Sequence, residues 1–184
     1  MFGTVHVDSV RVALEALSAS HCRTVYDYWN DLRGDRFAPT WQEFDLWRLH
    51  PAVIPFTHVA DVRQAPFDIV YRFWGTGMTE VLGYDRTGKS LTSAPMGYLD
   101  EDRRRHALAD YQEVVATRAP KPFLWDAASA RRDRLRLIVP GQRLPLSDDG
   151  ARVTQVVTTI DFSDTREIWE DLFEVHKREP KLGT

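Results

Sequence analysis

The chain has 184 residues, of which 43% are hydrophobic and 28% charged, and a formal net charge of −3. A chain of about this size buries roughly 70% of its extended surface, which is enough for one good core. No run of residues approaches the roughly 18 apolar residues that a membrane span requires. Basic and acidic residues are mixed along the chain, which excludes the broad positive surface typical of nucleic-acid binding. We therefore expect neither a membrane nor a nucleic acid as partner.

The N-terminus and the cysteine content indicate the compartment. The first residues, MFGTVHVDSVR, lack the basic and then apolar pattern of a secretory signal. Cys22 is the single cysteine of the chain, so it cannot form an intramolecular disulfide. Both features lead us to expect a cytoplasmic protein. Because Cys22 falls on an apolar helical stripe, a buried and inert thiol is favoured over a reactive one.

The first part of the chain, residues 1–54, is predicted to be a helical extension. Apolar residues from Asp8 to Leu17 have the i, i+3, i+4, i+7 spacing of an amphipathic helix. A second helical pattern runs from Ser20, a good N-cap, to Gly34, a typical C-terminal stop. Residues 41–50 have the pattern of a further short helix.

Residues 55–162 form the predicted core, which begins with two adjacent strands. Residues 56–62 have the pattern of one strand, and residues 67–74 alternate with period two as a second. A short helix from Thr76 to Gly83 follows directly. The next turn signal, Thr87-Gly88, fits either an ordinary turn or a loop that contacts a ligand.

The second half of the core is predicted to be a long helix and an antiparallel meander. The helical pattern runs from Leu99 to Thr117, and a strong turn signal lies at residues 147–150. Three strand-like runs are residues 122–128, 134–140 and 152–161. Residues 163–184 are predicted to be a C-terminal helix and tail. The sum is an α+β fold, a five-stranded antiparallel sheet with helices on one face.

Several short motifs resemble those of PAS domains. They are Tyr28-Trp29, Leu32-Arg33-Gly34, Pro39, Tyr71-Arg72-Phe73-Trp74-Gly75-Thr76, Gly83, Thr87-Gly88 and Leu144-Pro145-Leu146. Over about residues 22 to 162 the chain resembles the bacterial stand-alone PAS-like proteins that begin with Tyr-Trp and Leu-Arg-Gly and carry Arg-x-x-Gly-Thr. Asp161-Phe162-Ser163 also resembles the Asp-Ile-Thr that ends many PAS domains before a signalling helix.

The resemblance implies a sensory or interaction role and carries over no catalytic residue, so we do not expect an enzyme. PAS domains that bind flavin covalently use a cysteine in a short helix near Asn and Arg, whereas Cys22 lies in the N-terminal helical region. PAS domains that bind haem often use a histidine on the long helix, where His106 is the candidate. His106 lies about 200° around the helix from Leu108 and should point to solvent. Neither cofactor is therefore expected, and the cofactor stays unassigned.

The resemblance and the apolar pattern together predict a ligand pocket between the sheet and the helices. Its predicted lining is Tyr71, Phe73, Thr76, Met78, Leu82, Tyr84, Tyr111 and Trp125. Strict alternation of the second strand directs Tyr71 and Phe73 to this pocket and Arg72 and Trp74 to the opposite face. The alternative is that the same side chains fill a dry core.

The predicted function is that of a PAS-type signalling module that binds a small organic ligand and passes the signal to an unidentified protein. A ligand-free interaction or dimerisation adaptor is the alternative, with a homodimer expected through the N-terminal or C-terminal helices. An enzyme is the remote alternative, because no nucleophile elbow, phosphate loop or metal-ligand spacing is present. His58, among apolar neighbours, is better explained as a core or edge histidine than as a metal ligand.

Overall fold

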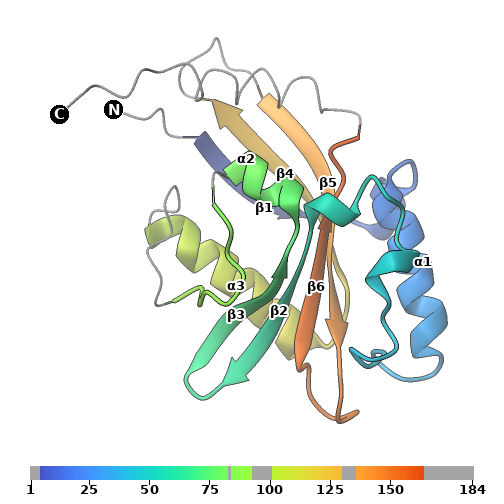
Figure 1. Cartoon of the computed structure of the whole chain (residues 1–184). Coiled ribbons are helices and arrows are strands. Elements are labelled where there is room, and N and C mark those ends of the chain that lie inside the picture. Colours follow the sequence, from blue (N-terminus) through green and yellow to red (C-terminus); the bar gives the residue numbers. More distant parts are fainter. Residues whose placement is uncertain (1–4, 83, 93–100, 130–135, 164–184) are drawn as a thin grey trace.

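Within residues 5–82, 84–92, 101–129 and 136–163, which the computed structural model describes, six antiparallel strands form one sheet in the order β1-β4-β5-β6-β2-β3 (Figure 1). The strands are β1 (Val5–Arg11), β2 (Thr57–Gln64), β3 (Phe67–Trp74), β4 (Lys121–Ser129), β5 (Arg136–Leu146) and β6 (Gln155–Ile160). The predicted α+β class is confirmed. The predicted number of strands, five, is wrong because β1 adds a sixth beside β4.

Strand β1 occupies a stretch that was predicted to be helical. It pairs antiparallel with β4, from Val5 opposite Ser129 to Arg11 opposite Phe123, and the 3-10 helix η1 (Leu14–Leu17) follows it. The short apolar pattern of this stretch fits a helix and a strand alike. Backbone hydrogen bonds to β4, a partner distant in sequence, decide between them in favour of the strand.

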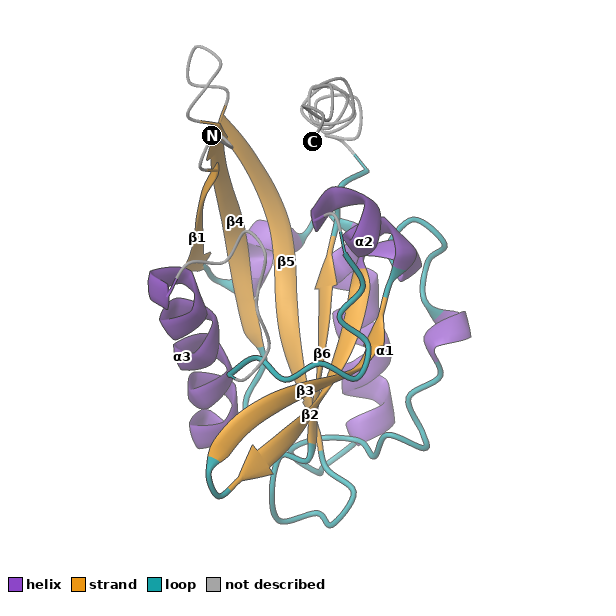
Figure 2. Ribbon diagram, turned by 60° about the vertical axis from the view of Figure 1, so that its left-hand side comes forward, coloured by secondary structure: helices purple, strands orange, loops and turns teal. Residues whose placement is uncertain are grey.

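Helices cover both faces of the sheet (Figures 1 and 2). Helix α3 (Glu101–Thr117) packs on one face together with α2 (Thr76–Leu82), and α1 (His21–Arg33) packs on the other. The buried α3-side core consists of Ala60, Ile69, Tyr71, Trp74, Met78, Leu91, Tyr111, Val114, Phe123, Val139, Val153, Val156, Ile160 and Phe162. The α1-side core consists of Val25, Trp29, Ala38, Phe44, Leu49, Val53, Val59, Leu144, Leu146 and Val157.

Helix α1 begins and ends where its capping signals predict. The Ser20 hydroxyl accepts a hydrogen bond from the Cys22 N–H at 2.9 Å, and Gly34 ends the helix with φ of 55°. Trp29 is buried against the sheet and donates its Nε1–H to the Pro145 carbonyl at 2.7 Å. The apolar face of α1 is therefore covered by the chain's own sheet.

The other predicted elements differ mainly in their limits. Residues 41–50 form turns and the 3-10 helix η2 (Leu46–Arg48), and a second 3-10 helix, η3 (Ile54–Phe56), precedes β2. The fifth strand continues to Leu146, six residues beyond its predicted end at Pro140. The predicted C-terminal helix falls on residues 164–184, which lie outside the described part. No described helix is both long and apolar enough to cross a bilayer.

Candidate functional site

A β-bulge in β3 decides which aromatic side chains face α3. The register between β2 and β3 shifts by one residue and leaves Arg72 as the extra residue on β3. Tyr71 and Trp74 consequently lie together in the α3-side core, with ring centroids 4.8 Å apart, while Phe73 packs against the α1-side core. The prediction that grouped Phe73 with Tyr71 and put Trp74 on the opposite face was wrong, because it assumed unbroken alternation.

His58 of β2 and Tyr111 of α3 meet inside the α3-side core. His58 Nε2 and the Tyr111 hydroxyl lie 3.0 Å apart, and the two residues are only 6% and 1% exposed. The imidazole stacks on Trp74 at 5.0 Å and meets Tyr71 edge-on at 5.5 Å. The histidine is thus enclosed by three aromatic side chains, one of which is its hydrogen-bond partner.

Burial and nearby charge keep this histidine neutral. Burial is the largest cause that lowers the pKa of His58 well below its usual value, and the positive charges of Arg143 and Arg86 lower it further. Burial likewise raises the pKa of Tyr111, so its hydroxyl keeps its proton. When Tyr111 donates this proton to Nε2, the imidazole proton lies on Nδ1, which has no hydrogen-bond partner among the described residues.

Arg143 of β5 is the inner end of a chain of ion pairs. Arg11 pairs with Glu113, and Lys121 Nζ donates to Glu113 at 2.6 Å and to Asp110 at 2.7 Å. Asp110 Oδ2 lies 3.0 Å from Arg143 Nη1. Side-chain exposure falls from 48% at Arg11 to 6% at Lys121 and 11% at Arg143. The network therefore runs from the exposed side chain of Arg11 to the buried guanidinium of Arg143.

Aromatic rings hold the Arg143 guanidinium in place. Its central carbon lies 4.6 Å from the centre of the Phe123 ring and 5.3 Å from that of Tyr111. The Phe123 ring lies against Gly141, where an added Cβ would come within 2.5 Å of two ring carbons. A side chain at position 141 would displace Phe123 and, with it, the support of the guanidinium.

Arg86, in the loop after α2, supplies a second buried guanidinium. It is 2% exposed, and its central carbon lies 5.2 Å from the Trp74 ring and 5.6 Å from the Tyr71 ring. Arg86 Nη2 donates to the Tyr84 hydroxyl at 2.7 Å. Arg86 therefore approaches the same aromatic rings that enclose His58. We call His58, Tyr71, Trp74, Arg86, Tyr111 and Arg143 the polar cluster.

The turn at Thr87-Gly88 positions Arg86. The Asp85 carboxylate accepts hydrogen bonds from the Thr87 N–H and hydroxyl, both at 2.7 Å, and Gly88 has φ of 76°. Gly88 N–H then donates to the Tyr71 carbonyl at 2.7 Å. The segment is an ordinary turn in its local geometry, as one of the two interpretations had it. Its tertiary effect is to fasten the Arg86 loop to the edge of β3.

The predicted pocket residues are divided by the fold. Tyr71 and Tyr111 belong to the polar cluster, and Tyr84 contacts it through Arg86. Met78 and Trp125 belong to or pack against the α3-side core. Thr76 is exposed, and Phe73 is on the other face. Leu82 ends α2, and its side chain lies outside the described part.

Sequence reasoning did not place His58, Trp74, Arg86 or Arg143 at a site. His58 could have been found, because it shares the period-two face of β2 with apolar residues. Arg143 was missed because β5 was predicted to end at Pro140. Arg86 carries no local signal, since only the packing of its loop on β3 buries it.

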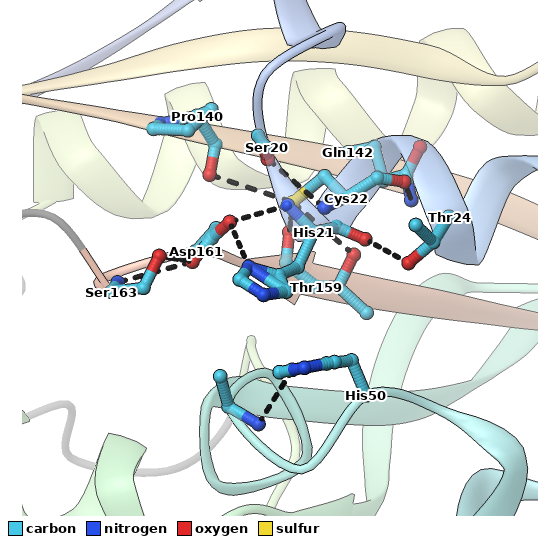
Figure 3. A network of polar contacts seen from close by, with 11 residues as sticks. Ser20, His21, Cys22, Thr24, His50, Pro140, Gln142, Thr159, Asp161 and Ser163 are labelled. Atoms are coloured by element: carbon cyan, nitrogen blue, oxygen red, sulfur yellow. Dashed lines mark hydrogen bonds and ion pairs between the residues drawn. The ribbon is translucent and has the colours of Figure 1, made fainter.

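A second polar network lies where β6 ends (Figure 3). The buried Asp161 carboxylate accepts hydrogen bonds from the His21 N–H at 2.6 Å and from the Ser163 hydroxyl at 2.6 Å. Burial by itself would raise the pKa of Asp161, but the hydrogen bonds from Ser163 and His21 lower it below its usual value. The His21 ring contacts His50, with centroids 3.9 Å apart. The residue after β6 is thereby tied to the first turn of α1.

Cys22 lies beside this network and is buried. Its sulfur is within 3.7 Å of the Pro140 and Thr159 carbonyl oxygens, and the residue is fully buried. Burial raises the pKa of the thiol to about 12, so it is protonated at neutral pH. The predicted burial of the thiol is confirmed, and the raised pKa supports the prediction that it is inert.

In the described part of the chain, no three His, Cys, Asp or Glu side chains gather as a metal site requires. His106 is exposed on α3, as its helical position predicted.

Comparisons with known proteins assign no family. No family model and no curated protein matches the chain. Among solved structures, an RNA-binding Light-Oxygen-Voltage receptor is similar, with 14% sequence identity and a TM-score of 0.43. The match covers 97% of this chain and 46% of the receptor, so the chain spans less than half of that receptor's length. A likeness this distant carries no argument about function.

Proposed function

We propose that the chain is a PAS-type sensory module that binds a small organic molecule between the sheet and α3. Its sequence motifs resemble those of PAS domains, and an antiparallel sheet with short helices and one long helix is the architecture that this resemblance implies. The observation that carries the proposal is the polar cluster, in which five separate segments bring polar and aromatic side chains together inside the core.

The cluster is not satisfied by the described residues. Three buried nitrogens, Nδ1 of His58, Nε1 of Trp74 and Nε of Arg143, have neither a hydrogen-bond partner nor an ion-pair partner among the described residues. A core that only stabilises a fold pairs almost all such atoms, because each unpaired one costs about 1–3 kcal/mol. Three in one site are what a binding site for a polar group offers. These atoms favour ligand binding over the alternative of a dry core.

Signal output through a protein partner, and a homodimer, are part of the proposal. A dimer contact through the N-terminal segment is less well supported, because β1 pairs with β4 and α1 packs on the sheet of its own chain. The C-terminal segment is then the expected dimer contact. We expect the full chain to be dimeric by light scattering and residues 1–163 to be monomeric. A full chain that is monomeric would contradict this part of the proposal.

Ligand binding is tested on the purified full chain. Native mass spectrometry should detect a retained small molecule, or a thermal-shift screen should find a compound that stabilises the chain. Ligand at 100 times its Kd should raise the melting temperature by about 5–10 °C. Tyr111→Phe, which removes the hydroxyl beside His58, should reduce this shift. Tyr28→Phe is the matched control, because its hydroxyl bonds Asp45 N–H on the opposite side of the sheet.

Two results would contradict ligand binding. The first is a chain that retains no molecule and that no compound stabilises. The second is equal ligand response in the Tyr111→Phe and Tyr28→Phe variants. Either result would favour the ligand-free adaptor, in which the aromatic side chains serve only as core.

A further inference from the structure

The unpartnered atoms of the polar cluster are all hydrogen-bond donors. Trp74 Nε1 and Arg143 Nε carry N–H groups that cannot accept a hydrogen bond. His58 Nδ1 is also an N–H when Tyr111 donates to Nε2. The Arg143 contact with Asp110 is an ion pair without hydrogen-bond geometry, so Nη1 of this guanidinium is a further donor. A site of this kind is complementary to acceptor oxygens.

The ion-pair chain that ends at Arg143 holds one more cation than carboxylates. In the ion-pair chain, Arg11, Lys121 and Arg143 share the carboxylates of Asp110 and Glu113. The innermost cation, Arg143, is 9% exposed, and a buried charge is costly unless it is fully paired. A ligand with a single negative charge would balance the surplus cation of this ion-pair chain.

Flat rings surround the donors. Trp74 and His58 stack at an angle of 29°, and the Tyr71 ring stands at 78° to Trp74. Aromatic and apolar walls of this kind favour the body of an apolar molecule over that of a sugar. The planar guanidinium of Arg143 matches the planar carboxylate group, to which it can donate more than one hydrogen bond.

We infer that the site binds the carboxylate of a small organic monoacid with an apolar body, with Arg143 as its ion-pair partner and Trp74 and His58 as neutral donors. This inference rests on the proposed function and names the ligand class of the same site.

The test compares acids with their neutral amides. Calorimetric titration of the full chain measures the affinity for three such pairs: benzoate and benzamide, indole-3-acetate and indole-3-acetamide, and hexanoate and hexanamide. Inorganic phosphate is a separate probe. At least one acid should bind about tenfold or more tightly than its amide, because a hydrogen bond to a charged group is the stronger one. Phosphate should bind more weakly than that acid.

Variants identify the residue that binds the acid. Arg143→Gln should lose about tenfold or more in affinity for the preferred acid and little for its amide. Arg143→Lys keeps the charge and should retain an intermediate affinity, which guards against a folding defect in Arg143→Gln. Arg152→Gln is the matched control, because Arg152 pairs with Asp149 at the surface and its side chain is 66% exposed. Circular dichroism melting confirms that each variant is folded.

The outcomes separate this inference from the proposed function. If no acid binds better than its amide, or if Arg143→Gln binds the acid as wild type does, the carboxylate inference is overturned. Ligand binding itself survives that result if native mass spectrometry still detects a retained neutral molecule. If no molecule is retained and none of the acids, amides or screened compounds binds, both proposals fail.

Discussion

Each face of the sheet buries a tryptophan indole, and the two indole N–H groups differ in their hydrogen bonding. On the α1 side, Trp29 donates Nε1–H to the Pro145 carbonyl, whereas on the α3 side Trp74 Nε1 has no partner in the described chain. Gln142, on the α1 side, donates its amide N–H to the Cys22 carbonyl at 2.6 Å, and its amide oxygen has no partner within the described residues. The indole N–H is therefore satisfied by the protein's own backbone on the α1 face and not by the described residues on the α3 face.

The largest expected effect is on the ion pairs under α3. Asp110→Asn removes the carboxylate that Lys121 and Arg143 share, and leaves two largely buried cations without it. Breaking a buried pair in this way costs about 3–5 kcal/mol. Urea denaturation should show the loss, while Asp27→Asn, at the exposed Arg23 pair, should cost less than about 1 kcal/mol. Similar values for the two variants would refute a buried network.

The paired tryptophans give the most direct test of the contrast between the faces. Trp29→Phe leaves the Pro145 carbonyl without its donor, whereas Trp74→Phe removes a donor that has no partner among the described residues. Beyond the shared loss of volume, Trp29→Phe should cost about 1–3 kcal/mol more. Chemical denaturation of both variants measures this difference. Equal losses would mean that the two indole N–H groups are paired alike.

The α3 face should also make stability depend on pH near neutrality. Because burial lowers the pKa of His58 in the folded chain, the unfolded chain binds more protons as the pH falls below about 6.5. Stability should therefore fall with decreasing pH, by up to about 1.4 kcal/mol per pH unit between pH 6.5 and 5. His58→Asn should flatten this slope in denaturation curves. An unchanged slope would show that His58 is not the group that titrates.

The smallest expected effect lies at the Asp161 network on the α1 side. The pKa of Asp161 is below its usual value of 3.8 in the folded chain, so the unfolded chain takes up the proton first as the pH falls. The stability from this carboxylate is present above about pH 4 and is lost as the pH falls through the folded pKa. Asp161→Asn should remove that dependence and cost about 1 kcal/mol at pH 7. If the stability of the variant fell at low pH as that of the wild type does, Asp161 would not be the group responsible.

Elements set by local signals were predicted well. Ser20 and Gly34 mark the ends of α1, and the Thr76 helix and the turn at residues 147–150 lie where their patterns put them. Elements set by distant partners were not. The first strand depends on β4, and the pairing of Tyr71 with Trp74 on one face depends on a bulge against β2.

By itself, the sequence determined the α+β class, the capped helices, the turns and the burial of Cys22, because each follows from residues close together in the chain. Only the tertiary structure decided which side chains form the polar cluster. His58, Arg86, Tyr111 and Arg143 come from separate segments, and only sheet register and loop packing bring them together. Burial then gives them their chemistry, since it lowers the pKa of His58, raises that of Tyr111 and leaves Arg143 Nε without a hydrogen-bond partner among the described residues.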